Sequence, residues 1–166
     1  MTKEEIIKKG QFHLNEHRPD YSELRINLYL DFFEKEMEIL FANLPSLSSE
    51  PQMTLITETI NELLCFDQTN KDWLSDQIWK HYEICVENAS YGMVPYEGFD
   101  SESEANRAFF KVYSREDAYD AVKLKEVWAD MDFTEFRHFN LVFKCPWDDE
   151  HGISIGVING KFDSIN

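Results

Sequence analysis

Alternation between apolar and polar side chains in the C-terminal part of the chain is the feature that most constrains the fold. One strand face is formed by Phe139, Leu141, Phe143 and Cys145, and the pattern returns at Ile153, Ile155 and Val157. Asn159-Gly160 is the strongest short signal for a hairpin, and residues 161–165 then run back as a further strand. The C-terminal part therefore predicts an antiparallel sheet.

The N-terminal part shows helical spacing instead. Five apolar residues follow the i, i+4, i+7 pattern and predict one long amphipathic helix over about residues 22–42: Ile26, Leu30, Phe33, Met37 and Leu40. Prolines and serines predict a linker over residues 44–51, and further apolar stripes predict helices over residues 53–66 and about 70–88. Gly92, Pro95 and Gly98 mark a loop.

Beyond that loop, residues 109–113 are expected to form a strand, residues 116–121 a short helix capped by Ser114, and residues 122–128 another strand. The sequence thus predicts an α+β fold in a single domain of 166 residues. N-terminal helices, in a helical part of about residues 1–90, are followed by a small, mainly antiparallel β-sheet over about residues 109–166. Residues 92–108 fit either a linker or a loop of that one domain.

Charge narrows the range of partners. The chain has 32 acidic and 16 basic residues, a net charge of -16, and the excess is divided evenly between its two halves. Such a surface argues against nucleic acid and against an anionic membrane surface, because both attract Lys and Arg. No apolar run approaches the roughly 20 residues of a membrane span, and the charged N-terminus does not read as a secretory signal, so a cytoplasmic location is expected.

The cysteines and histidines outside the C-terminal region give no site. Cys65, Cys85 and Cys145 are odd in number and widely spaced, so reduced, non-catalytic thiols are expected. His13 and His17 belong to an H-x-x-E-H pattern that zinc peptidases use on a helix, but Pro19 would end that helix, and we interpret the match as chance. His81 is expected to pack half-buried on its helix, and His138 has no evident partner.

The densest functional-looking segment is Pro146 to Gly152, which is expected to be a loop between two strands. We favour a structural interpretation, in which His151 meets a neighbouring carboxylate, Trp147 anchors the loop on the core and Gly152 takes a positive φ. The alternative is a metal-dependent hydrolase that uses Asp148, Asp149, Glu150 and His151. No phosphate-binding or nucleophile motif is present, so no catalytic, metal or cofactor site is predicted.

The run from Phe143 to Ile153, followed by Asn159-Gly160-Lys161-Phe162, resembles a group of uncharacterised bacterial proteins. In that group a W-D-x-E-H-G turn joins the C-terminal strand pair, and some members resemble immunity proteins of polymorphic toxin systems. The resemblance is clearest over residues 120–166, and its marker positions here are Trp147, Asp148, Glu150, His151 and Gly152. It implies no catalytic activity.

Together these features predict a protein-binding function more than an enzymatic one. An acidic inhibitor of a basic protein, such as a toxin domain, would imitate a phosphate surface and associate quickly through electrostatic steering. The expected contact region is an acidic loop, with Glu116, Asp117 and Asp120 as additional contacts. Its members are Glu97, Asp100, Glu102 and Glu104.

Overall fold

The structure is a computed structural model that describes residues 1–14, 21–44, 50–89, 91, 98–131 and 136–166. The elements are, in chain order, α1 (Lys3–Lys9), β1 (Gln11–Leu14), β2 (Ser22–Leu30), η1 (Asp31–Phe33), β3 (Lys35–Leu44), α2 (Glu50–Leu64), α3 (Gln68–Asn88), α4 (Glu102–Phe110), α5 (Arg115–Ala121), β4 (Lys123–Asp130), β5 (His138–Cys145), β6 (Asp148–Ile158) and β7 (Lys161–Ile165). The predicted α+β class is confirmed.

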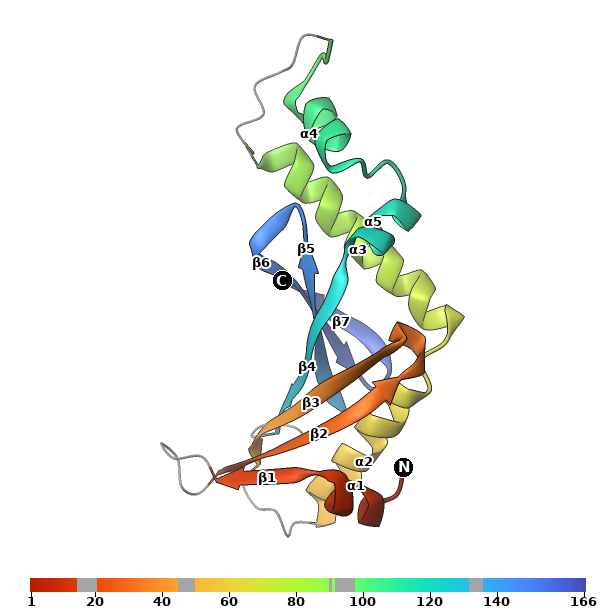
Figure 1. The fold of residues 1–166 in the computed structure, drawn as a ribbon, viewed down its shortest axis with the longest axis vertical. Helices are drawn as coiled ribbons and strands as arrows, with labels where there is room; N and C mark the ends of the chain where they lie inside the picture. Colours follow the sequence, from red (N-terminus) through yellow and green to blue (C-terminus); the bar gives the residue numbers. More distant parts are fainter. Residues whose placement is uncertain (15–20, 45–49, 90, 92–97, 132–135) are drawn as a thin grey trace.

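All seven strands form one sheet whose spatial order, β1 to β7, is also their order in the chain. Each neighbouring pair is antiparallel except β3 and β4, which run parallel. Two antiparallel meanders, β1–β3 and β4–β7, therefore meet at one parallel seam. The helices α2 to α5 lie between them in the chain, as Figure 1 shows.

The predicted helix over residues 22–42 is wrong, because this segment forms the hairpin of β2 and β3. Its buried side chains follow a period of two: Leu24, Ile26, Leu28 and Leu30 on β2, and Met37, Ile39 and Phe41 on β3. Ile26, Leu30 and Met37 fit both the helical spacing and the alternation of these two strands. The spacing of the apolar residues therefore did not distinguish a helix from a hairpin. The chain reverses through η1 and Glu34, which has a left-handed φ of 50°.

The expected division into a helical part at 1–90 and a small sheet at 109–166 is also corrected. Three strands precede α2, and two helices follow residue 100, so the sheet has seven strands drawn from both ends of the chain. The predicted strand at residues 109–113 is instead the end of α4 and the connection to α5. Ser101 caps α4 by accepting a hydrogen bond from the Glu104 backbone N–H.

Other expectations are confirmed. Helices α2 and α3 occupy the two predicted helical segments, and Ser114 caps α5 through the Asp117 backbone N–H. Asn159 and Gly160 both have positive φ, as a two-residue hairpin turn between β6 and β7 requires. Residues 45–49 of the predicted linker and 92–97 of the predicted loop lie outside the described residues.

A continuous hydrophobic core joins the helices to one face of the sheet. It combines Ile56, Ile60 and Leu63 of α2 and Leu74, Ile78 and Tyr82 of α3 with the alternate buried residues of β2 to β6. The carboxyl-terminal half of α3 thereby comes to lie beside the β5–β6 turn. Among the described residues, no helix is long and apolar enough to cross a membrane.

Candidate functional site

Trp147 lies in the turn before β6, and the other marker residues lie in or beside a large bulge at the start of β6, where a loop was predicted. The turn between β5 and β6 is only Pro146-Trp147, and Cys145 already pairs with Asp148. The next paired residues are Phe143 and Ile153, so residues 149–152 of β6 stand opposite Lys144 alone. Bulges of this kind bend a strand and redirect its side chains, and they are common next to functional sites.

Gly152 closes the bulge, and its φ of 73° confirms the predicted left-handed conformation. A Cβ at this position would lie 2.3 Å from the Phe143 carbonyl oxygen on the neighbouring strand. A side chain is therefore excluded both by the backbone conformation and by the close approach of β5. Position 152 thus requires a glycine for a physical reason.

Asp148 and His151 meet across the bulge, as predicted. The His151 backbone N–H donates to Asp148 Oδ1 at 3.1 Å, and the imidazole Nδ1 lies 3.2 Å from the same oxygen. The His151 side chain is 81% exposed, whereas that of Asp148 is 26% exposed. An exposed pair of this kind contributes little to stability through charge alone, so the backbone hydrogen bond is the more important of the two.

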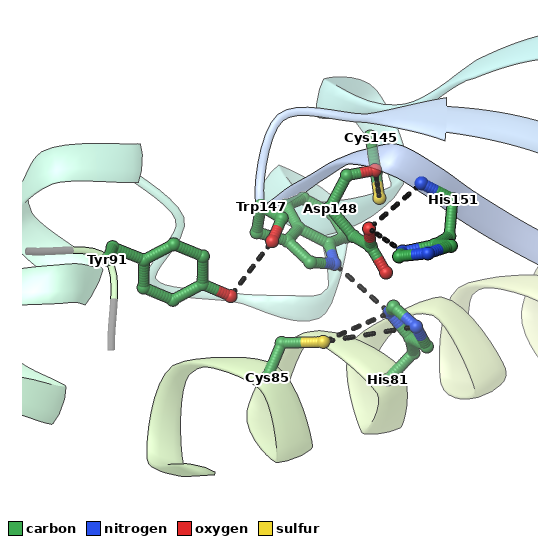
Figure 2. A network of polar contacts seen from close by, with 7 residues as sticks. All are labelled: His81, Cys85, Tyr91, Cys145, Trp147, Asp148 and His151. Carbon is green, nitrogen blue, oxygen red and sulfur yellow. Dashed lines mark hydrogen bonds and ion pairs between the residues drawn. The ribbon is translucent and has the colours of Figure 1, made fainter. Parts of the chain in front are cut away.

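Trp147 anchors the turn on α3, which confirms its predicted role. Its side chain is 2% exposed and stands edge-on to Tyr82, with ring centroids 4.9 Å apart. Its indole Nε1 donates to Nδ1 of His81 at 3.1 Å, and its backbone carbonyl accepts from the Tyr91 hydroxyl at 2.8 Å. Figure 2 shows Trp147 held between α3 on one side and Tyr91 on another.

The hydrogen bond from Trp147 fixes the protonation of His81. Indole Nε1 can only donate, so Nδ1 of His81 must be unprotonated and the neutral ring carries its proton on Nε2. Burial lowers the pKa of His81, with nearby Asp148 opposing this by favouring the charged form. His81 is half-buried, as expected, but it is a hydrogen-bond acceptor and not merely a packing residue.

The two thiols of the cluster are held in the unreactive form. Burial raises the pKa of Cys145 to about 12 and also raises the pKa of Cys85, whose Sγ lies 3.7 Å from Nδ1 of His81. A nucleophilic cysteine needs the opposite shift, which a cationic neighbour or a helix N-terminus would supply. The Cys85–His81 contact therefore does not form a thiolate–imidazolium pair.

The hydrolase alternative gains no support from this geometry. Of its four residues, Asp148 and His151 contact one another, while Asp149 forms an ion pair with Lys144 at 2.7 Å. In the part of the chain that the structure describes, no three His, Cys, Asp or Glu side chains are grouped so as to hold a metal ion. The arrangement serves best to lock a strand turn onto a helix.

The predicted acidic contact residues lie partly on a helix. Glu97 is outside the described residues, Asp100 is exposed, and Glu102 and Glu104 belong to the first turn of α4, which corrects the expected loop. The Glu104 carboxylate accepts from the Asp100 backbone N–H. The additional residues Glu116, Asp117 and Asp120 are exposed on α5.

Long-range partners of the site were missed by the sequence reasoning. His81, Cys85 and Tyr91 approach the marker turn from positions about 55–65 residues earlier in the chain. His81 and Cys85 are four residues apart, so they share one face of α3. That spacing was the only sequence signal, and it does not reveal which strand the helix face covers.

Comparison with known proteins assigns a family. The family described as "Domain of unknown function (DUF6985)" matches residues 10–165, which is almost the whole chain and includes the bulge and both meanders. No curated protein and no solved structure matches the chain significantly.

Proposed function

The chain belongs to the DUF6985 family, whose description states no activity, and we propose from its surface that it is an acidic binding protein that neutralises a basic protein partner. The contact surface of this proposal is the α4–α5 segment, defined here as residues 98–121. One observation carries the proposal: exposed carboxylates and exposed aromatic rings occur together in this segment. Its exposed acidic residues are Asp100, Glu102, Glu104, Glu116, Asp117 and Asp120.

The arginines of the segment neutralise this surface only in part, because both bond to α3, although Arg115 also lies 3.6 Å from Glu116. Arg115 bonds to Asp76 at 2.7 Å, and Arg107 lies 3.7 Å from Glu87 with its guanidinium over the Tyr82 ring. Both arginines are only partly exposed, whereas the six carboxylates are exposed. The segment thus presents six exposed carboxylates against the exposed Lys111, so its outward surface is negative.

Three aromatic side chains accompany these carboxylates. Phe99, Phe109 and Tyr113 are 37%, 55% and 65% exposed. Large aromatic residues supply much of the binding energy at protein interfaces, and charges at the rim mainly accelerate association. A basic partner with an apolar contact area, such as the nucleic-acid-cutting domain of a toxin, has the matching chemistry. The resemblance to immunity proteins points to the same class of partner.

The test uses co-expression with the product of the adjacent gene, followed by purification of the complex and growth rescue. Glu102→Lys/Glu116→Lys removes charge from the segment while sparing Glu104 and Asp117, whose carboxylates accept backbone hydrogen bonds. The matched control is Glu36→Lys/Asp163→Lys, which makes the same change of charge at exposed positions of β3 and β7.

We expect the segment variant to bind at least tenfold more weakly, mostly through a slower association rate, while the control retains affinity. Phe109→Ala/Tyr113→Ala should instead accelerate dissociation. Equal weakening by both charge variants would mean that net charge and not this surface is responsible. Absence of any complex together with failure of growth rescue would refute the proposed function.

A further inference from the structure

The parallel seam between β3 and β4 closes over only part of its length. Residues 39–42 of β3 pair with residues 127–130 of β4, but the four residues before each paired run, 35–38 and 123–126, are not paired with one another, and the two strands diverge there (Figure 1). Counted along both strands, an unbroken pairing would bring Lys35 opposite Lys123, but β4 has a register shift between Leu124 and Glu126 that interrupts its regular geometry. We call the opening between the two strands the wedge.

Two features keep the wedge open. Like charges directly opposite one another destabilise a strand pair, so Lys35 and Lys123 oppose closure. In addition, Lys35 reaches across the wedge and donates its ammonium to the Leu124 backbone carbonyl at 3.0 Å. A side chain thus occupies the acceptor that a neighbouring strand would otherwise use.

A cavity of about 660 Å³ lies at the mouth of the wedge. Its apolar lining comes from η1, the C-terminal end of α5, the start of β4 and the end of β5, and consists of Phe32, Phe33, Tyr119, Val122, Leu124 and Phe143. Glu34, Lys35, Asp120 and Lys123 contribute both signs of charge to its rim, so charge alone selects no ligand. The volume is within the range of ligand-binding cavities, and the lining combines apolar and polar surface in similar amounts.

We propose that the wedge binds an extended peptide segment of another protein, which adds as a strand along the open edges of β3 and β4. Unpaired backbone donors and acceptors on a strand edge are the template for such strand addition. A four-residue opening admits two side chains of the added strand toward the apolar lining, because alternate residues of a strand point to the same side. The cavity shares Tyr119 and Asp120 with the α4–α5 segment, but the strand edges of the wedge lie outside that segment, so the proposal does not depend on the proposed function.

The role of Lys35 predicts in which direction the peptide affinity should change when Lys35 is replaced. A peptide backbone N–H must displace the Lys35 ammonium from the Leu124 carbonyl, so removing that ammonium should favour the peptide. We therefore expect Lys35→Met to bind the peptide severalfold more tightly, and Phe32→Ala, which removes part of the apolar lining, to bind it at least tenfold more weakly. Lys161→Met is the control, since Lys161 is exposed on β7, outside the wedge and the cavity lining.

The probe is a random octapeptide phage library selected on the full chain, with the recovered peptide synthesised for titration. Hydrogen exchange followed by NMR reports strand addition directly, because the amides within residues 35–38 and 123–126 that point into the wedge should gain protection. A second titration adds a short-chain fatty carboxylate as a competitor and tests whether the wedge binds a small anion instead of a peptide.

Tighter binding to Lys35→Met with protection of those amides supports the proposal. Weaker binding to Lys35→Met, or saturation by the carboxylate alone, would instead indicate an anion site and overturn it. Protection that grows with protein concentration in the absence of peptide would assign the wedge to a second copy of the chain. Failure to recover any peptide that protects these amides would also reject the proposal.

Discussion

Replacing Trp147 with Phe tests whether the marker turn is held to α3 by a specific hydrogen bond. The variant keeps an aromatic ring against Tyr82 but removes the indole Nε1 that donates to His81. A net hydrogen bond of this type is worth about 0.5–1.5 kcal/mol. The smaller ring also leaves unfilled space at a side chain that is 2% exposed, which costs about 1–2 kcal/mol more.

The expected loss of unfolding free energy is therefore about 1.5–3.5 kcal/mol, equivalent to a fall in Tm of about 3–14 °C for a domain of this size. Urea denaturation followed by circular dichroism gives the free energy, and a thermal scan gives the Tm. His81→Asn is the informative companion, because the Asn Oδ1 takes approximately the place of Nδ1 and can accept from Trp147. This variant should lose less than Trp147→Phe.

The same hydrogen bond predicts a pH dependence. Because burial holds the pKa of folded His81 below that of the unfolded chain, the unfolded state binds more protons in the range below about pH 6.5. Stability from His81 is thus complete above the unfolded pKa and is lost as the pH falls toward the folded pKa. The loss between pH 7.5 and 5.5 should be smaller in His81→Asn, because that variant lacks the buried imidazole whose pKa is lowered.

Two results would refute this reasoning. One is a Trp147→Phe variant whose unfolding free energy lies within about 0.5 kcal/mol of the parent chain, the limit expected for a position away from such features. The other is an equal loss of stability on acidification in the parent and in His81→Asn, which would mean that His81 is not held neutral in the folded state.

Three further outcomes follow from the structure. Gly152→Ala should lower the unfolding free energy by at least about 2 kcal/mol, because it adds a backbone clash to left-handed strain; Gly98→Ala, also at positive φ but with open space around it, should cost less in the same urea titration. At pH 8, a thiol reagent should modify exposed Cys65 readily and Cys145 only after unfolding, because burial raises the Cys145 pKa to about 12; rapid labelling of Cys145 in the folded protein would contradict this. Asn106→Ala should cost about 1–3 kcal/mol, because the fully buried amide donates to the Val86 carbonyl at 3.1 Å; an unchanged Tm would show that this bond is unimportant.

The C-terminal sheet could be predicted because its signals are local. Alternation at Phe139 to Cys145 fixes which face is buried, and Asn159-Gly160 supplies the positive φ that its turn needs. The β2–β3 hairpin has no such signal. Its reversal at η1 and Glu34 contains no Gly, Pro or Asn to indicate a turn. The prediction therefore depended on the apolar residues alone, whose spacing fits a helix as well as a pair of strands.

A local signal for α4 existed and was misjudged. Ser101 and Glu104 have the spacing of an N-cap followed three residues later by Glu, which marks a helix start at Glu102. Phe109 and Phe110 suggested a strand by their type alone. The site divides in the same way: the Asp148–His151 contact spans three residues and could be expected, whereas the Trp147–His81 contact depends on how α3 lies on the sheet.

The strand order has a kinetic consequence. Every antiparallel pair joins strands that are consecutive in the chain, so both meanders can form from short-range contacts. Pairing β3 with β4 instead closes a loop from Leu44 to Lys123, at an entropic cost of about 4 kcal/mol plus a constant. We therefore expect the two meanders to form early and the seam to join late. The wedge is then the part of this late-forming strand pair in which residues 35–38 and 123–126 stay unpaired in the folded protein.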